Sequence, residues 1–222
     1  PARSEYPASY YASTLNEDTD YPSLQQELTA ETCIIGGGYA GLMTAMSLIE
    51  RGHTDIALLE QHRVGWGASG RNGGFVFGGY SLSPQKLVAR VGEEKARNLY
   101  QLTISAVELI RKRVEQYSID CELVDEGVIL ANWFKDQKLL HEQAQFMQQK
   151  MKVNWKYLSP RQLSSLINSD RYCGGLYEPN AMHFHPLNFA RGIARQIDAT
   201  QASIFESSMV TSVNTNSEEK VV

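Results

Sequence analysis

A glycine-rich turn between an apolar run and a helix constrains the fold of this 222-residue chain more than any other feature. The apolar run 33–35 leads into the turn 36–41, of sequence GGGYAG, and Glu60 ends the next apolar run, 56–59. A strand, a glycine turn, a helix and an acid at this distance are typical of a βαβ unit that binds an adenine dinucleotide.

Each glycine of the G-x-G-x-x-G pattern has a separate role. Gly36 permits the tight bend, Gly38 lets the backbone approach a pyrophosphate, and Gly41 allows the helix to pack closely against the strand. We expect the helix over 39–51, closed by Gly52, with its unpaired N–H groups and positive dipole end facing the phosphates. A purely structural turn between a strand and a helix is the alternative.

Glu60 indicates which nucleotide the turn would take. Its carboxylate would accept hydrogen bonds from the ribose hydroxyls and repel a 2′-phosphate, which argues against NADP.

A second glycine-rich segment, 65–74 of sequence GWGASGRNGG, favours a flavin over NAD. An NAD-binding unit would pass directly into its next crossover helix at this point. The backbone can lie against a large planar ligand, Ser69 and Asn72 add side-chain hydrogen bonds, and Arg71 supplies a fixed positive charge. A flexible surface loop is the alternative, although the flanks of the segment are unusually apolar.

Composition excludes several classes of protein. With 42% hydrophobic residues and no apolar run near the ~18 residues that cross a bilayer, the chain has no membrane-spanning segment. A net charge of −4 with scattered Lys and Arg gives no footprint for nucleic acid. Three cysteines without C-x-x-C spacing, and a start at Pro1 without a signal segment, lead us to expect a cytoplasmic protein.

At these residues the sequence resembles the flavin-dependent amine and amino-acid oxidases of the D-amino-acid oxidase superfamily, and within it the gamma-glutamylputrescine oxidoreductases. Beyond the two glycine segments, the resemblance extends to 6–11 (YPASYY), 117–121 (YSIDC), 169–172 (SDRY) and 183–188 (HFHPLN). It spans nearly the whole chain, but members of the family are much longer.

The resemblance implies an α/β fold, with a Rossmann-like FAD-binding domain, an inserted α+β substrate domain and a truncated C-terminus. It implies FAD as the cofactor and an enzyme that oxidises the C–N bond of an amine similar to gamma-glutamylputrescine. The imine would hydrolyse to an aldehyde, and molecular oxygen would reoxidise the flavin. The catalytic residues stay unassigned, because the family carries much of the substrate pocket in the distant half.

The expected FAD contacts fall on the two glycine segments and their neighbours, with the backbone of Val210 beside the adenine. They are Gly36, Gly38, Tyr39, Ala40, Gly41, Glu60, Gln61, Gly67, Ala68, Ser69, Gly70, Arg71, Asn72, Gly73 and Val210. The i, i+2 pair His183 and His185 lacks a visible third metal ligand and is interpreted as structural or pocket-lining. His62 is interpreted as a surface residue rather than a covalent flavin attachment point.

We expect four regions along the chain: an arm at 1–30, the FAD-binding βαβ unit and glycine segment at 31–80, a helical and substrate-domain portion at 81–185, and a return to the FAD-binding domain at 186–222. The arm is expected to be extended over 6–21 and packed on the body, or else disordered.

Hydrophobic periodicity predicts the remaining elements. A helical stretch at 87–117, broken near Gly92, carries an apolar stripe expected to be core: Leu99, Leu102, Ala106, Ile110, Val114 and Tyr117. The other expected elements are strands at 119–123, 128–130, 174–177, 202–205 and 209–213 and helices at 135–151, 160–166 and 186–197.

Residues 218–222 look like the opening of a strand, so we expect the chain to be an N-terminal fragment. As an isolated chain it should then bind FAD weakly or not at all, show no turnover, and self-associate through its exposed edge. Two alternatives stay open: a non-catalytic fragment that folds or pairs with a complementary chain, and an NAD-dependent dehydrogenase.

Overall fold

The computed structural model describes residues 5–200 and 202–215, which form two compact units. Unit 1 takes in the described residues of Pro1–Gly74, Val114–Glu122 and Phe184–Val222, and unit 2 takes in Phe75–Arg113 and Leu123–His183. In chain order, unit 2 therefore interrupts unit 1 twice.

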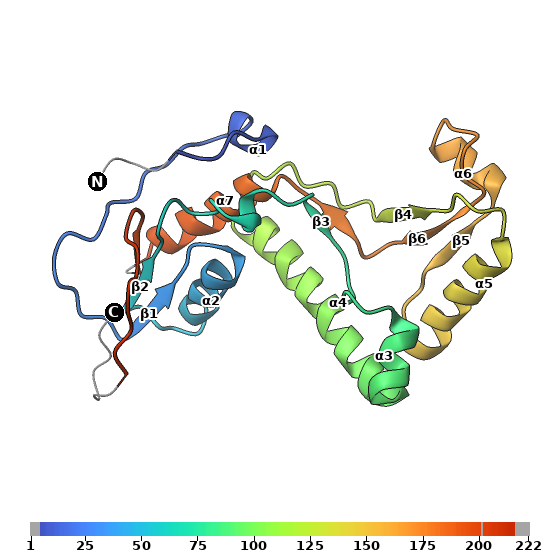
Figure 1. The fold of residues 1–222 in the computed structure, drawn as a ribbon, viewed down its shortest axis with the longest axis horizontal. Helices are drawn as coiled ribbons and strands as arrows, with labels where there is room; N and C mark the ends of the chain where they lie inside the picture. The colour runs from blue at the N-terminus through green and yellow to red at the C-terminus, as the bar shows by residue number, and fades with distance from the viewer. Residues whose placement is uncertain (1–4, 201, 216–222) are drawn as a thin grey trace. The chain divides into compact units, whose positions relative to one another are not determined.

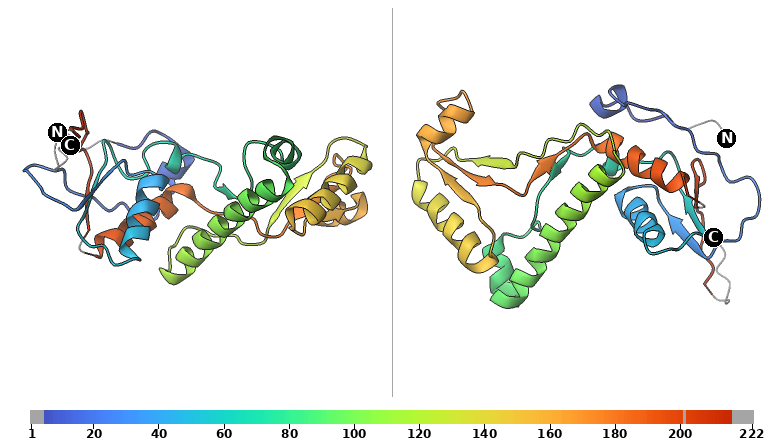
Figure 2. Two further views of the ribbon diagram at one scale, coloured as in Figure 1. Left: turned by 90° about the horizontal axis from the view of Figure 1, so that it is seen from below. Right: turned by 180° about the vertical axis from the view of Figure 1, so that it is seen from behind.

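Unit 1 is built on a parallel sheet of order β1-β2-β8, in which Ile34 pairs with Leu58 and Leu58 with Ile204. Helices α2 and α7 pack against each other beside these strands (Figure 1; Figure 2). The elements are α1 (Tyr10–Ser13), β1 (Thr32–Ile35), α2 (Tyr39–Ile49), β2 (Ile56–Leu59), the 3₁₀ turn η1 (Ala68–Gly70), α7 (Pro186–Asp198) and β8 (Ser203–Phe205).

Unit 2 holds an antiparallel sheet of order β4-β6-β5 and a two-stranded antiparallel pair, β3 and β7. Its elements, together with α4, which runs on into unit 1, are β3 (Phe75–Val76), α3 (Pro84–Val91), α4 (Glu93–Gln116), β4 (Val128–Ala131), α5 (Gln137–Phe146), the π-helical turn η2 (Met147–Met151), β5 (Lys156–Leu158), α6 (Pro160–Leu166), β6 (Gly175–Glu178) and β7 (Met182–His183). A parallel nucleotide-type sheet and an inserted antiparallel sheet confirm the predicted α/β fold class.

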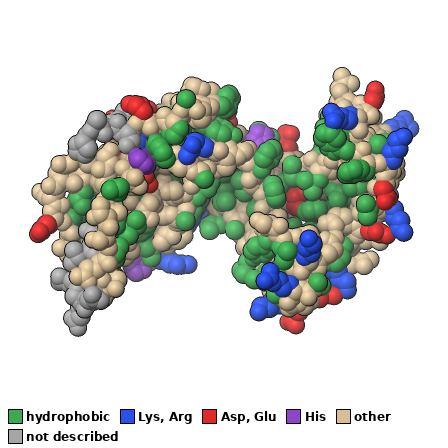
Figure 3. All heavy atoms as spheres, in the orientation of Figure 1, with side chains coloured by type: hydrophobic (Ala, Val, Ile, Leu, Met, Phe, Trp, Pro, Cys, Tyr) green, Lys and Arg blue, Asp and Glu red, His purple; other side chains and the backbone are tan. Residues whose placement is uncertain are grey.

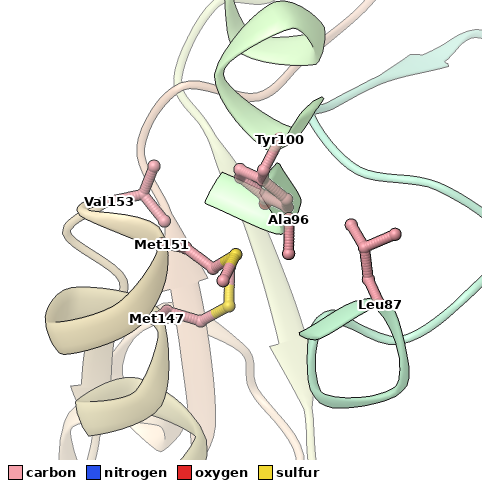
Figure 4. Close-up of a cluster of buried hydrophobic side chains, with 6 residues drawn as sticks. All are labelled: Leu87, Ala96, Tyr100, Met147, Met151 and Val153. Carbon is pink, nitrogen blue, oxygen red and sulfur yellow. The ribbon is translucent and has the colours of Figure 1, made fainter. Parts of the chain in front are cut away.

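The stripe predicted for the long helix is wrong in part. Leu102 is 64% exposed and Ala106 is also exposed, whereas Tyr100 and Val107 are buried. Because successive helical residues are about 100° apart, Leu102 lies some 200° around the helix from Tyr100 and cannot share its face. The core of unit 2 forms where α3, α4 and η2 meet, as Figure 4 shows, from Leu87, Ala96, Tyr100, Met147, Met151 and Val153.

Two predicted strands are absent from the described residues. Residues 119–123 alternate buried and exposed side chains, with Ile119 and Cys121 buried, but they make no strand ladder. Burial alternation without a partner strand does not produce a strand. Residues 209–213 run without strand pairing as well. The strand opening predicted at 218–222 lies outside the described residues.

Local capping signals correctly predicted the break between α3 and α4 and the beginnings of α6 and α7, whereas the short elements α1, β3, β5 and β7 were not predicted. Gly92 separates α3 from α4 and has a φ of +83°, and Ser159 caps α6 through its hydroxyl. Pro186 begins α7, and the ring Nδ1 of His185 accepts a hydrogen bond from the N–H of Asn188 (3.1 Å). These ends follow from the preferences of Ser and Pro at helix starts and of Gly after helix ends.

His185 and His183 occupy different environments: His185 is buried, and His183 is exposed. The Nε2 atom of His185 lies 3.0 Å from the Thr14 hydroxyl, and burial lowers the pKa of its ring. The exposed His183 instead lies edge-on to Phe75. No group of three metal-ligating side chains occurs among the described residues.

The N-terminal arm packs on the body of unit 1, as expected, but includes the short helix α1. The Tyr6 hydroxyl donates to the carbonyl of Val64 (2.7 Å), and the Arg63 guanidinium lies 4.3 Å from the centroid of the Tyr6 ring. Burial raises the pKa of Tyr6 to about 12. Within the described chain no helix is both long and apolar enough to cross a membrane, and all three cysteines are free.

Candidate cofactor site

The turn between β1 and α2 has the geometry that its glycines predict. Gly36 adopts a φ of +101°, which favours glycine, and its N–H donates to the carbonyl of Leu59 (2.8 Å). A Cβ at Gly41 would lie 1.9 Å from the carbonyl oxygen of Gly36. The first and last glycines of the pattern therefore bring the start of α2 against the turn.

The N-terminus of α2 presents backbone donors at the carboxyl end of the parallel sheet. The first N–H groups of a helix have no intrahelical partner, and here they belong to the turn and to Tyr39, Ala40 and Gly41. The N–H of Tyr39 donates to the hydroxyl of Ser69 (3.0 Å). The helix has 11 residues, so its dipole adds to the attraction for an anion at this end.

Glu60 lies at the end of β2 and faces the turn. Its Oε2 accepts a hydrogen bond from the N–H of Gly37 (2.7 Å), and its Oε1 accepts one from the N–H of His62 (2.8 Å). A carboxylate has about four lone-pair sites, so two acceptor positions remain for other donors. Sequence reasoning placed Glu60 correctly beside the turn but did not foresee its bond to Gly37.

The second glycine segment packs on the first rather than forming a free loop. The N–H of Gly65 donates to the carbonyl of Gly37 (2.9 Å), and a Cβ at Gly70 would lie 2.2 Å from the Gly65 carbonyl oxygen. Residues Ala68–Gly70 form the 3₁₀ turn η1, which packs against α7. The surface-loop alternative is therefore wrong for 65–70.

Asn72 ties the end of this segment to α2 and to its own turn. Its side-chain amide donates to the carbonyl of Ser69 (2.9 Å) and lies 3.5 Å from the Tyr39 hydroxyl, while its Oδ1 accepts from the N–H of Gly74 (2.8 Å). Tyr39 donates its hydroxyl to the carbonyl of Pro186 (3.1 Å), and burial raises its pKa to about 12. Tyr39 and Asn72 thus hold the two glycine segments together.

Arg71 is exposed, and its guanidinium stays near its own segment. Its Nε donates to the carbonyl of Gly67 (3.3 Å), and the group lies 5.3 Å from the centroid of the Trp66 ring. Ala68 and Gly73 are exposed on the same segment. The proximity of Arg71 to a flavin stays a prediction.

Two predicted contacts lie farther along the chain. Gln61 is exposed directly after Glu60, and Val210 is half-buried in the irregular segment that follows β8. That segment passes the sheet end at Ser208, whose N–H donates to the carbonyl of Glu60 (2.8 Å). The structure thus brings this segment beside Glu60, although not as the strand that we expected.

Sequence reasoning missed a buried charge cluster behind the sheet end. Oε1 of Glu206 accepts from Nη1 of Arg191 (2.6 Å) and from the N–H of Val64 (2.7 Å), and Oε2 lies 3.7 Å from Nε of Arg63. Arg63 also pairs with Asp18. An arginine on the apolar face of α7 was the available signal, because such a residue needs a buried partner.

The residues present fit a bound dinucleotide with a flavin. A helix N-terminus for phosphates, a carboxylate at the end of the second strand and a second glycine segment against the same turn all lie within unit 1. Gly38 supports this fit, because its backbone is extended and a Cβ there would meet only the Ser69 side chain.

A model of the FAD dependent oxidoreductase family matches residues 31–222. The chain belongs to this family. Membership in an FAD-dependent family contradicts the alternative of an NAD-dependent dehydrogenase.

Two curated relatives are similar to this chain over 94% of its length. Gamma-glutamylputrescine oxidoreductase from Escherichia coli (strain K12) is 36% identical over 217 residues, and the match covers 49% of that protein. A probable oxidoreductase OrdL from Haemophilus influenzae is 34% identical over 210 residues, with 48% of it covered. The chain thus spans about half the length of the curated relatives it matches.

Solved structures support the fold. L-Amino acid deaminase from Proteus myxofaciens superposes with a TM-score of 0.73 at 20% identity, covering 91% of this chain and 43% of that one. L-alpha-Glycerophosphate oxidase from Mycoplasma pneumoniae with FAD bound gives a TM-score of 0.62 at 18% identity, covering 84% and 47%. At these identities the comparison shows a shared fold.

Proposed function

We propose that the protein is a flavin-dependent oxidase that oxidises the C–N bond of an aliphatic amine, of the gamma-glutamylputrescine type, to an imine. For a primary amine, water then hydrolyses the imine to an aldehyde and ammonia. When bound, FAD supplies the acceptor for the two electrons and passes them to molecular oxygen, which leaves as hydrogen peroxide.

The observation that carries the cofactor half of this proposal is the Glu60 carboxylate held against the turn by the N–H of Gly37. In this position Glu60 would take the ribose hydroxyls, and the N-terminus of α2 would take the pyrophosphate. The segment from Gly67 to Gly73 would run along the flavin, with Ser69 and Asn72 as its polar side chains. The chain's contribution is therefore to bind and orient the cofactor.

The proposed substrate class rests on sequence similarity to a relative. The relative from Escherichia coli is named a gamma-glutamylputrescine oxidoreductase and is 36% identical across nearly all of this chain. The relatives named after amino acids in the structural comparison share only about 20% identity. We therefore favour an amine over an amino acid.

The proposed location is the cytoplasm. The three free cysteines fit its reducing conditions.

Anaerobic mixing tests the proposed function. The purified native protein should carry a flavin spectrum, and gamma-glutamylputrescine should bleach it, while glycine and L-amino acids at the same concentration should not. Readmitting oxygen should restore the spectrum and release hydrogen peroxide. A flavin that glycine or L-amino acids bleach faster than the amine would contradict the substrate class, and a colourless protein would contradict the cofactor.

A further inference from the structure

The N-terminal arm precedes the residues that the family model matches, yet it contacts several parts of unit 1. In Figure 1 and Figure 2 it runs as a blue trace along the outside of this unit. It contains one short helix, α1, and Tyr21 is the one buried residue among its described residues 5–30. A chain end with so little buried surface can open locally while the rest of the protein stays folded.

The beginning of the arm supports the second glycine segment. The Tyr6 hydroxyl donates to the carbonyl of Val64 (2.7 Å), and the indole N–H of Trp66 donates to the carbonyl of Glu5 (2.9 Å). Between these two contacts lies Gly65, whose N–H donates to the turn between β1 and α2 (2.9 Å). The arm therefore holds both neighbours of the residue that joins the two glycine segments.

The other end of the arm contacts the segment that follows β8. The N–H of Leu24 donates to the Ser208 hydroxyl (2.9 Å), and the carbonyl of Pro22 accepts from the N–H of Glu206 (3.0 Å). Ser208 in turn donates its own N–H to the carbonyl of Glu60 (2.8 Å). Both ends of the arm thus contact segments that are hydrogen-bonded to the cofactor turn or to Glu60.

The middle of the arm is held by charge. Asp18 and Asp20 both pair with Arg63. Glu17 pairs with Arg195 on α7 (3.1 Å), and Figure 3 shows acidic side chains along the course of the arm. These three acidic side chains are 49–65% exposed, and ion pairs with an exposed partner contribute little to stability. Opening the arm would also return the buried guanidinium of Arg63 to water, so the arm can detach at a low cost in free energy.

Docking of the arm would affect the cofactor through the conformational freedom of segment 63–66. When the arm opens, this segment loses its hydrogen bonds to Glu5 and Tyr6 and gains freedom that FAD binding has to remove again. A docked arm removes that freedom in advance, so FAD binds more tightly to the docked state. Coupling between two binding events is reciprocal, so bound FAD stabilises the docked arm by the same factor.

We propose that the N-terminal arm regulates the cofactor site: the docked arm and bound FAD stabilise each other, with Tyr6 as the positioning residue for segment 63–66. This inference rests on the proposed function, because it requires FAD at the turn between β1 and α2. Detaching the arm would then release the flavin without altering any of the expected FAD contacts.

Titration of the flavin-free native protein with FAD, followed by flavin fluorescence, tests one side of the coupling. Tyr6→Ala should bind FAD at least about fivefold more weakly than wild type. Tyr6→Phe keeps the ring over Arg63 and loses only the bond to Val64, so it should weaken FAD at least about twofold. Tyr10→Ala, at a 68% exposed position of the same arm, is the matched control and should change FAD binding less than about twofold.

Hydrogen exchange of arm amides tests the other side and separates coupling from a purely structural role. The N–H of Asn16 donates to Oδ1 of Asn188 (3.1 Å) and that of Leu24 donates to Ser208, so both amides report docking. Saturating FAD should slow the exchange of both amides at least about fivefold in wild type, and by a smaller factor in Tyr6→Ala. An arm that only supports the fold would exchange at the same rate with and without FAD.

Wild-type exchange rates that FAD leaves unchanged, or a loss of affinity in Tyr6→Ala below about fivefold, would overturn the coupling. If Tyr6→Ala does not fold, an unchanged affinity in Tyr6→Phe has the same meaning. A wild-type protein that binds no FAD would contradict the proposed function as well. When wild type binds FAD, each of the other failures therefore concerns the arm alone.

Discussion

Oε2 of Glu60 and the backbone N–H of Gly37 form a 2.7 Å hydrogen bond that joins the end of β2 to the turn between β1 and α2. This bond holds an acid next to a helix N-terminus, which are the two groups that a dinucleotide needs. It also makes Glu60 part of the turn, so the effect of a substitution on FAD has to be compared with its effect on a flavin that lacks the adenosine ribose.

Gly38→Ala should lose FAD and leave the fold intact in the native protein. The added methyl group would occupy the surface that a pyrophosphate approaches, and within the described chain it would meet only the Ser69 side chain, whose hydroxyl oxygen would lie 3.0 Å away. The ratio of flavin to protein absorbance measures the first effect, and thermal unfolding measures the second.

Two further variants make this test specific. Gly38→Ala combined with Ser69→Ala removes the internal contact, and FAD binding should stay far below that of Ser69→Ala alone, which controls for the proposed flavin contact of Ser69. Recovery would mean that crowding of Ser69, rather than the pyrophosphate, was responsible. Gly41→Ala should instead prevent stable folding, because its methyl group would lie 1.9 Å from the Gly36 carbonyl oxygen.

Arg71→Met should lower the reduction potential of the bound flavin and slow amine oxidation. A guanidinium keeps its proton at working pH and would stabilise negative charge on the reduced ring. Arg71→Lys should keep most of the potential, because it keeps the charge. If the potential is the same in all three proteins, Arg71 is a surface residue that contacts only Gly67 and Trp66.

Glu206→Gln should lower the free energy of unfolding by about 3–5 kcal/mol, the usual cost of removing one partner from a buried ion pair. The change leaves Arg191, which is fully buried, without its counter-charge. Urea denaturation measures the effect. Glu142→Gln, which loses only an exposed pair with Lys138, should change stability by less than about 1 kcal/mol. Equal effects of the two variants would show that the cluster is not coupled to folding.

Glu178→Gln should stabilise the protein at neutral pH and lose this advantage in acid. Burial raises the pKa of Glu178, so the folded state binds its proton more tightly than the unfolded state does. The resulting stability is complete below the unfolded pKa of about 4.3 and disappears as the pH rises through the higher folded value. Gln does not titrate.

Melting temperatures of wild type and Glu178→Gln, measured from about pH 4 to about pH 7, should therefore diverge as the pH rises. Tyr100 does not titrate over this range, and burial raises its pKa still further above it. A constant difference between the two proteins would show that Glu178 does not titrate differently on folding.

Much of unit 1 could be predicted from short sequence patterns, because the local backbone geometry dictates which residue types occur in them. Gly36 needs a positive φ and Gly41 has no room for a side chain, so a glycine pattern is readable without knowing the rest of the fold. Contacts between residues that are distant in sequence could not be predicted from the sequence. Glu206, Arg191 and Arg63 lie far apart in sequence, and only the folded unit brings their charges together.

The same distinction explains the wrong elements. The face that α4 buries depends on what packs against it, and Met147 and Met151 of η2 select Tyr100 and Ala96 rather than Leu102. Residues 119–123 and 209–213 have strand-like sequences but find no pairing partner in the described chain. Strand formation depends on that partner more than on propensity.

Titration of the flavin-free native protein with FAD, followed by flavin fluorescence, tests the central claim most directly. Glu60→Ala should weaken FAD by about 1–3 kcal/mol, or about 5- to 150-fold in Kd, because charged hydrogen bonds to the ribose are lost. FMN lacks the adenosine ribose and should bind wild type and Glu60→Ala with equal affinity. Glu27→Ala, at an exposed position, should change the affinity for neither FAD nor FMN. An FAD affinity that is unchanged in Glu60→Ala would contradict the placement of the cofactor at this turn.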